Sequence, residues 1–263
     1  MIIAQITDTH LSDVDAADPK FSARAENLRA CIADINDLDP LPDAVIHTGD
    51  ITQHGRAAEF AHARALLQTL EAPLYVTPGN RDGRDGVVGA FAVDGYIMPD
   101  YAFVHYAINE HPVRLVAVDS LGNGIGPKGD FCHDRLAALD ATLAEAPTQP
   151  TALFMHHPPF DVPAAPDPFA YQRRRAVVDL ATVVSRHKQV IHIFAGHMHR
   201  PWTAMLGGVS ASTVPSVAAD LRYGSYLPTM AKQPVYQIHR FEGDEGFVNE
   251  PRLPGSDAGS LKA

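Results

Sequence analysis

Five short blocks of metal-ligand residues occur in one order along the chain, and each contains oxygen or imidazole donors. Four of the five directly follow an apolar run that is typical of a buried strand. Because the ends of parallel strands meet at one edge of a sheet, residues far apart in the sequence are brought together there. The pattern favours an α/β fold with a two-metal site for phosphoester chemistry. The blocks are Asp8–His10, Gly49-Asp50, Gly79–Asp82, His156-His157 and Gly196–His199.

The composition allows a packed core without disulfide bonds. The chain has 263 residues, 46% of them hydrophobic, and Cys31 and Cys132 have neither metal-ligand nor disulfide spacing. We therefore expect reduced thiols and a cytoplasmic protein. Residues 1–6 lack the basic flank of a signal peptide and match a core strand instead. No apolar run approaches the ~20 residues needed to span a bilayer, so we expect no membrane partner.

The formal net charge of −10 bears on the partners of the protein. A nucleic acid polymer would be repelled by this negative field, so we expect none. A small phosphoester remains a suitable substrate, because bound divalent cations reverse the sign of the local potential.

Hydrophobic periodicity indicates a βαβαβ opening, which favours a parallel sheet with helical crossovers. The expected strands are 2–6, 43–47, 74–76, 101–107, 113–119, 153–155 and 190–195, with further β-like runs at 203–206, 209–214, 234–241 and 246–249. The expected helices are 22–38, 56–70, 133–145 and 170–186. Glycines between 122 and 129 predict a flexible loop. We expect residues 1–250 to form one domain and residues 251–263 a flexible tail.

Two blocks contain ligand-type residues two positions apart. In an extended segment, Asp8 and His10 would point to the same side, and so would His197 and His199. A carboxylate with imidazoles suits Zn, Mn or Fe. Taken alone, the Asp8 and His10 pair is better explained as solvated residues at a strand end.

The three remaining blocks add a carboxylate, an amide and an imidazole. Asp50 follows a glycine that permits unusual backbone angles, and its two oxygens could bridge two ions. Asn80 follows Pro-Gly and offers an amide oxygen, although Asn is also common in ordinary turns. His156 precedes a rigid Pro-Pro pair. The absence of thiolates among these donors argues against a structural zinc site of the cysteine type.

These segments resemble the calcineurin-like metallophosphoesterase superfamily, and within it the bacterial class III cyclic nucleotide phosphodiesterases and glycerophosphodiesterases. The resemblance extends over residues 2–200 and implies a four-layer αββα sandwich with two mixed sheets. The segments that carry it are Ile6–His10, His47–Ile51, Thr77–Asn80, Phe154–Pro159 and Phe194–His199.

The resemblance also implies two ligand sets for divalent ions. One ion would be held by Asp8, His10, Asp50 and His199, and the other by Asp50, Asn80, His156 and His197. A metal-bound hydroxide would then attack phosphorus in line, because two cations acidify bound water and neutralise the phosphoryl oxygens. These donors accept Mn, Fe, Co or Zn.

Arg81 departs from the family pattern, which has His after the Gly-Asn pair. An arginine does not lose its proton in proteins, so it cannot act as a general acid, but it can bind phosphate oxygens. A surface arginine paired with Asp82 or Asp85 is the alternative. His157 and His54 are candidates to replace the missing His as general acid. For His157 the alternative is a role in packing or in supporting the metal ligands. For His54 the alternative is an ordinary solvent-exposed loop histidine.

Three functions fit these sequence features. The first is a phosphodiesterase for a small substrate, such as a cyclic nucleotide or glycerophosphodiester. The second is a pyrophosphatase or phosphomonoesterase on the same site, because Gly-Asn-Arg-Asp also resembles the motif of UDP-diacylglucosamine pyrophosphatases. The third is a non-catalytic scaffold with this fold. The resemblance also suggests that residues 200–250 form a cap or a dimerisation segment in a homo-oligomer.

Overall fold

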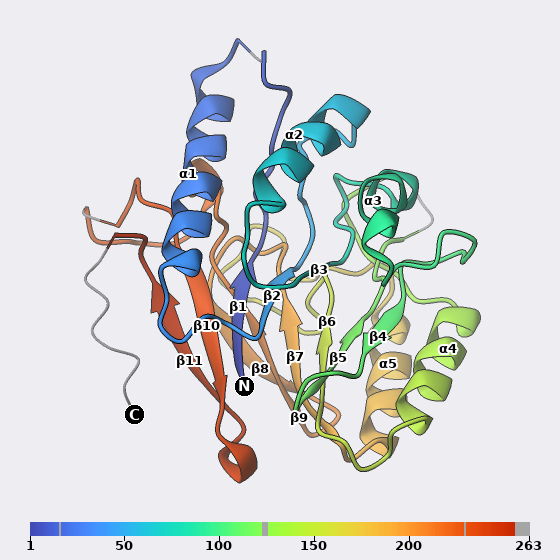
Figure 1. The fold of residues 1–263 in the computed structure, drawn as a ribbon. Coiled ribbons are helices and arrows are strands. Elements are labelled where there is room, and N and C mark those ends of the chain that lie inside the picture. The colour runs from blue at the N-terminus through green and yellow to red at the C-terminus, as the bar shows by residue number, and fades with distance from the viewer. Residues whose placement is uncertain (16, 123–125, 229, 256–263) are drawn as a thin grey trace.

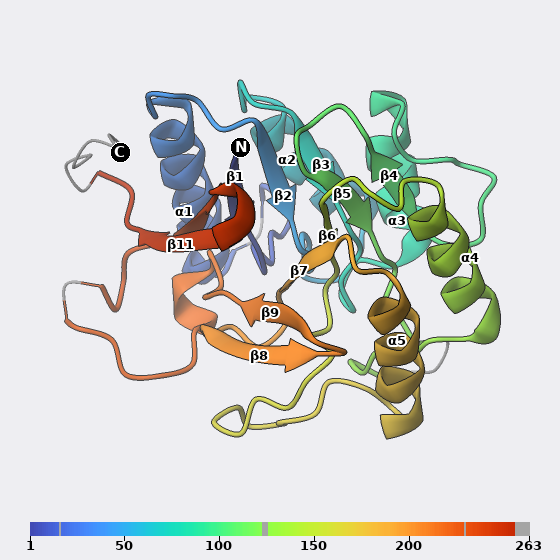
Figure 2. The same ribbon diagram turned by 90° about the horizontal axis from the view of Figure 1, so that it is seen from below.

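The computed structural model describes residues 1–15, 17–122, 126–228 and 230–255, and its strands form two mixed sheets (Figures 1 and 2). The strand order of the first sheet is β11-β10-β1-β2-β3, in which β1, β2 and β3 are parallel. Its strands are β11 (Phe247–Arg252), β10 (Tyr236–Phe241), β1 (Ile2–Ile6), β2 (Ala44–His47) and β3 (Leu74–Val76).

The second sheet has the order β4-β5-β6-β7-β9-β8, with a parallel centre and antiparallel outer strands. Its strands are β4 (Tyr106–Ile108), β5 (Arg114–Ala117), β6 (Thr151–Phe154), β7 (Val190–Ala195), β9 (Val209–Thr213) and β8 (Trp202–Leu206).

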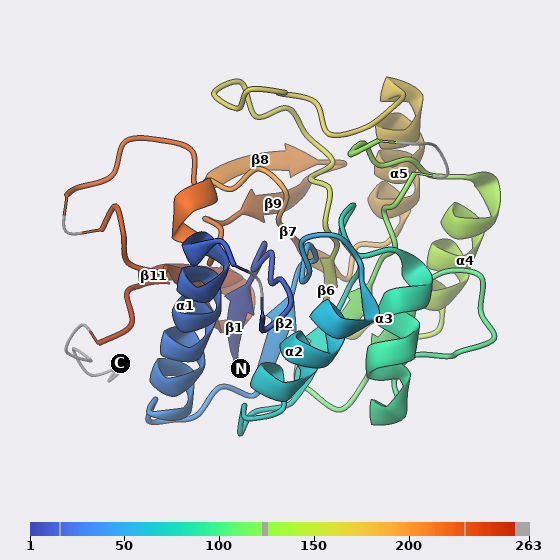
Figure 3. The same cartoon turned by 90° about the horizontal axis from the view of Figure 1, so that it is seen from above.

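Helices flank both sheets (Figure 3). The first group is α1 (Pro19–Asn36), α2 (Ala57–Leu67) and α3 (Arg84–Phe91), and the second is α4 (His133–Ala144) and α5 (Arg174–Arg186). Short 3₁₀ helices are η1 (Ala92–Asp94), η2 (Ala219–Leu221) and η3 (Gly243–Glu245). The predicted αββα sandwich is therefore confirmed.

The central strands have apolar residues on both faces, because both faces are covered. In β6, Phe154 packs with the core shared by the two sheets and helices α1 to α3, whereas Leu153 packs with α4 and α5. Phe194 and Ile193 of β7 alternate in the same way. This period of two explains why these strands appear in the sequence as nearly continuous apolar runs.

A buried polar side chain joins the two sheets. Gln5 of β1 is fully buried, and its Nε2 donates to Thr48 Oγ1 at 2.9 Å and to the Ala195 carbonyl of β7 at 3.1 Å. Its Oε1 accepts from His239 Nε2 of β10 at 2.9 Å. Gln5 therefore holds the carboxyl ends of β1 and β7 together, next to two of the ligand blocks.

Three sequence predictions about elements are wrong. Residues 83–100, to which the sequence pattern assigned neither helix nor strand, contain α3. Gly86 lets α3 approach α2, because a Cβ there would lie 2.2 Å from Phe60 Cε2. The strand expected at 101–107 begins only at Tyr106. The helix expected from residue 170 begins at Arg174, because Ala170 and Gln172 form backbone hydrogen bonds with Gly129 instead.

The predicted flexible tail is wrong at its start. Residues 251 and 252 belong to β11, and the buried Arg252 donates to Asp34 of α1 through Nε at 2.6 Å. Residues 256–263 of the predicted tail and 123–125 of the predicted glycine loop lie outside the described residues.

We predict that Gln5→Leu lowers the free energy of unfolding by about 3 kcal/mol, because it leaves buried polar groups of Thr48, Ala195 and His239 without partners. Urea unfolding followed by circular dichroism measures this loss. Gln68→Leu is the control, because Gln68 is exposed and its replacement should change stability by less than about 0.5 kcal/mol. Equal stability of the Gln5 variant and the control would contradict the proposed tie between the sheets.

Candidate metal centre

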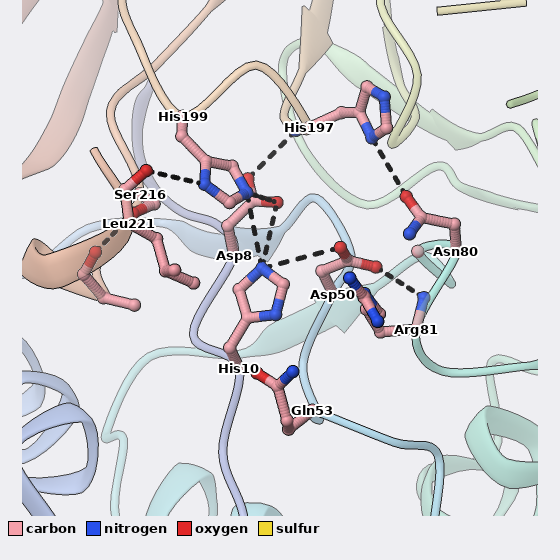
Figure 4. A network of polar contacts seen from close by, with 12 residues as sticks. Asp8, His10, Asp50, Gln53, Asn80, Arg81, His197, His199, Ser216 and Leu221 are labelled. Atoms are coloured by element: carbon pink, nitrogen blue, oxygen red, sulfur yellow. Dashed lines mark hydrogen bonds and ion pairs between the residues drawn. The ribbon is translucent and has the colours of Figure 1, made fainter. Parts of the chain in front are cut away.

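All five ligand blocks lie directly after strands, namely β1, β2, β3, β6 and β7. Backbone hydrogen bonds continue between the loops after β1 and β2, with Asp8 N–H donating to Gly49 O and His10 N–H donating to Asp50 O, both at 3.0 Å. The blocks therefore meet at the carboxyl ends of the strands, and Figure 4 shows side chains from the blocks after β1, β2, β3 and β7 converging from separate loops.

Four side chains form the first cluster (Figure 4). His199 Nε2 lies 3.1 Å from Asp8 Oδ1 and 3.3 Å from His10 Nε2. His10 Nε2 lies 3.5 Å from Asp50 Oδ2. Two carboxylates and two imidazoles thus point their ligand atoms at one small volume, and all four residues are buried or nearly so.

A second cluster lies on the other side of Asp50. Asn80 Oδ1 is 3.0 Å from His156 Nε2 and 2.9 Å from His197 Nδ1, and these two nitrogens are 3.1 Å apart. His156 Nε2 lies 3.6 Å from Asp50 Oδ1. The two oxygens of Asp50 therefore face different clusters, which is the arrangement of a carboxylate that bridges two metal ions.

Backbone carbonyls fix the orientation of two histidine rings. His156 donates its Nδ1–H to Thr48 O at 2.8 Å, and His199 donates its Nδ1–H to Leu221 O at 2.9 Å. In both rings the opposite nitrogen, Nε2, faces a cluster and is free to bind a metal ion. The donor set and its supporting hydrogen bonds fit divalent cations.

The electrostatics of the clusters also favour cations. Burial, together with the charge of Asp8, raises the pKa of Asp50 well above its ordinary value. Burial opposes ionisation of Asp8 as well, but the adjacent His199 and other imidazoles lower its pKa below the ordinary value. Burial lowers the pKa of His156, which keeps this ring neutral as a metal ligand requires. Positive charge between the two carboxylates would stabilise both in their ionised form.

The ligand loops are not extended, so the predicted backbone geometry is wrong. Five of the expected ligands have positive φ, a conformation that side chains with a Cβ adopt rarely. Left-handed turns, and not the alternation of an extended chain, therefore orient these side chains. Asp8 and His10 both reach the first cluster, whereas His197 and His199 point to different clusters, contrary to the prediction. The residues are Asp8 (51°), His10 (46°), Asp50 (51°), His197 (68°) and His199 (52°).

Glycines allow the loops to pack this closely. A Cβ on Gly79 would lie 2.0 Å from the Asp50 nitrogen, and one on Gly196 would lie 2.2 Å from Thr7 Oγ1. Gly49 combines a φ of 87° with a site for Cβ only 2.7 Å from His156 Nδ1. The unusual backbone angle expected at Gly49 is confirmed.

Asp82 is a supporting residue that the sequence interpretation missed. It is buried, and its carboxylate accepts hydrogen bonds from the backbone of Ile51, Thr52 and Gly79 at 2.8–3.1 Å and from the Thr52 hydroxyl at 2.9 Å. These bonds tie the loop after β2 to the loop after β3, although burial raises the pKa of Asp82 to about 6. The sequence signal was its position in the Gly79–Asp82 block.

The three candidate catalytic residues lie in different environments. Arg81 is exposed, its backbone N–H donates to Asp50 Oδ1 at 2.7 Å, and its side chain points back toward Asp50 (Figure 4). His157 is buried, and its ring nitrogens bond Ser120 Oγ at 2.9 Å and Pro127 O at 2.8 Å. His54 is exposed and pairs with Glu59 at 2.7 Å.

Two mixed sheets between helices, with paired clusters of carboxylate, amide and imidazole ligands, define a two-metal phosphoesterase fold. The sequence profile of the calcineurin-like phosphoesterase family matches residues 1–201. The chain belongs to this family and is a hydrolase, so the resemblance drawn from its motifs is confirmed.

Two curated relatives span most of the chain. It is 31% identical over 231 residues to the glycerophosphodiester phosphodiesterase GpdQ of Enterobacter lignolyticus, covering 85% of this chain and 80% of the relative. It is 26% identical over 220 residues to the 3',5'-cyclic adenosine monophosphate phosphodiesterase CpdA of Escherichia coli K12, covering 84% and 77%.

A solved structure supports the fold. A dimetal phosphatase from Danio rerio matches with a TM-score of 0.72 at 16% identity, covering 97% of this chain and 99% of that one. In the part of the chain that the structure describes, no helix has the length and apolar character needed to cross a membrane.

We predict that Gly79→Ala weakens metal binding at least about tenfold, because the new Cβ would displace Asp50 or the loop that carries Asn80. Calorimetric titration of the metal-free protein with Mn²⁺ measures the change. Gly89→Ala is the control: Gly89 lies in α3, where a Cβ would have no neighbour within 4 Å. Unchanged affinity in the Gly79 variant would show that the close approach does not shape the site.

Proposed function

We propose that the protein is a dinuclear metal-dependent phosphodiesterase that hydrolyses a small organic phosphodiester, either a cyclic nucleotide or a glycerophosphodiester. The observation that carries this proposal is the buried Asp50 carboxylate, whose two oxygens face two separate clusters. The relatives named above act on these two kinds of substrate. The negative net charge of −10 favours a small substrate over a nucleic acid polymer.

In this proposal each cluster holds one ion, and Asp50 belongs to both. Asp8, His10 and His199 complete the first ligand set, and Asn80, His156 and His197 complete the second. Mn, Fe, Zn and Co all suit these oxygen and imidazole donors. Two bound cations would supply Lewis acidity to the phosphoryl oxygens and a more acidic water.

Arg81 is the proposed phosphate clamp. Its exposed side chain lies beside Asp50, and its positive charge acts on that carboxylate. A guanidinium at this position can donate two hydrogen bonds to the equatorial oxygens of a phosphoryl group as charge develops there. Asp82 does not compete for Arg81, because backbone N–H groups and the Thr52 hydroxyl occupy its carboxylate.

The environments of the two histidines limit proton donation to the leaving group. The Nε2–H of His157 donates to Pro127 O, and its Nδ1 is bonded to Ser120, so packing is the role that the geometry favours. His54 forms a hydrogen bond through its Nδ1 with the Glu59 carboxylate. Arg81 cannot give up its proton. These observations keep the pyrophosphatase alternative open, since a pyrophosphate leaving group needs little protonation, whereas the relatives favour the diesterase.

The first test compares hydrolysis of bis(p-nitrophenyl) phosphate and p-nitrophenyl phosphate by the Mn²⁺-loaded protein. We predict a kcat/KM at least about tenfold higher for the diester, followed by activity on cyclic nucleotides or glycerophosphodiesters. A preference for the monoester would replace the proposal with a phosphatase. Inactivity on both with two ions bound would favour the pyrophosphatase or the scaffold.

We also predict that Arg81→Ala lowers kcat by about 100-fold while two ions remain bound, because the clamp acts on charge that develops in the transition state. Steady-state kinetics and metal analysis of the same preparation measure both quantities. Arg175→Ala, which removes an exposed arginine of α5, should leave both unchanged. Wild-type turnover of the Arg81 variant would exclude the clamp, and loss of an ion would assign Arg81 to the support of the site.

A further inference from the structure

A segment that lies outside the family match contacts two loops that carry residues of the first cluster. Residues 216–223, here called the strap, follow β9 and lie beyond residues 1–201. Val217 N–H donates to Thr7 O at 3.0 Å, and Ala218 N–H donates to Asp8 O at 3.4 Å. The strap is therefore hydrogen-bonded to the loop that carries Asp8.

The strap also holds His199 from two sides. Leu221 O accepts the Nδ1–H of His199 at 2.9 Å, and Tyr223 N–H donates to His199 O at 3.0 Å. The Tyr223 ring stacks on the imidazole with centroids 5.9 Å apart. The position of the strap thus decides which way the His199 ring faces and which of its nitrogens is free to bind a metal ion.

One ion pair joins the strap to the rest of the site. Arg24 of α1 donates to Asp220 in η2 through Nε at 3.0 Å and through Nη2 at 2.7 Å. Its Nη1 donates to Gln53 Oε1 at 2.7 Å and to His10 O at 3.3 Å. The Arg24 side chain is only 4% exposed, whereas that of Asp220 is 40% exposed.

We propose that the Arg24–Asp220 pair is a positioning device for the first metal ion, an inference that rests on the proposed function. The guanidinium contacts the backbone of His10 on one side and the residue next to Leu221 on the other. It therefore fixes two ligands of the first cluster, His10 and His199, relative to each other. No comparable contact joins Arg24 to Asn80, His156 or His197 among the described residues.

The planar guanidinium is required for this function. Its Nε and Nη2 bind the Asp220 carboxylate bidentately while Nη1 binds the loop of His10, and an ammonium group cannot reproduce this geometry. When Asp220 is lost, the strap can move away and Leu221 O no longer fixes the His199 ring. Loss of such an outer partner of a metal ligand typically costs about 10–100-fold in metal affinity.

The test uses Asp220→Asn and Arg24→Lys, and the metal-free proteins are titrated with Mn²⁺ by calorimetry and by electron paramagnetic resonance. We predict that one of the two ions binds about 10–100-fold more weakly in both variants and that the other is unchanged. Asp220→Glu should restore part of the affinity. The same titration is repeated in an Asn80→Ala background, which weakens the second site. The remaining ion, bound at the first cluster, should then show the loss of affinity.

Asp34→Asn is the matched control. It breaks the Arg252–Asp34 pair, which like the Arg24–Asp220 pair joins a buried arginine to a carboxylate and anchors α1, but whose arginine lies on β11. Thermal unfolding of every variant monitors the fold. Equal weakening of both ions, weakening shared by the control, or unchanged affinity would overturn the proposal. If the wild-type protein itself fails to bind two ions, the proposed function is what fails.

Discussion

The structure depends on a buried carboxylate placed between two groups of ligands. Asp50 lies in an environment that raises its pKa, and its two oxygens face opposite clusters. A buried charge of this kind is costly unless it is compensated. Two divalent cations would provide that compensation, and the same cations would supply the chemistry of phosphoester hydrolysis. The cations that would compensate the buried charge of Asp50 would therefore be the same cations that promote hydrolysis.

The surrounding backbone is shaped to hold this arrangement. Five of the proposed ligand residues adopt left-handed conformations that each carry an energetic cost, so the packing around them must hold them in place. Gly79 and Gly196 allow loops to approach within distances that any side chain would prevent. Asp82 binds one pair of loops together, Gln5 joins the sheets beneath them, and the Arg24–Asp220 pair connects the strap. Preorganisation is thus distributed over both sheets and over α1.

The fold and the site give different information about function: the fold defines the architecture, and the residues of the site define the chemistry. Structural similarity at 16% identity establishes the architecture, and the same architecture can serve different substrates. The ligand donors indicate metal-assisted hydrolysis, whereas Arg81 and the occupied ring nitrogens of His157 bear on which leaving groups the site can release. The proposed substrate therefore depends more on residues such as Arg81 and His157, which surround the metal centre, than on the proposed metal ligands.

The sequence by itself determined which segments form the central strands and which ligand blocks follow them. Buried parallel strands appear in a sequence as apolar runs, and the polar residues of a site stand at their ends. It therefore predicted a parallel α/β sheet and the residues that converge at its edge, whereas the prediction of a two-sheet sandwich came from the resemblance of the motifs to a known family. It missed α3, since Gly83, Gly86 and Gly89 lower the helix propensity of this segment, although of these three only Gly86 is placed against Phe60 where a Cβ would clash. It placed the ligand pairs on extended backbone, because left-handed turns at Asp8 and His199 arise only from the packing of neighbouring loops. Only the tertiary structure joined Asp220 to Arg24, since contacts between residues 196 positions apart leave no local pattern in the chain.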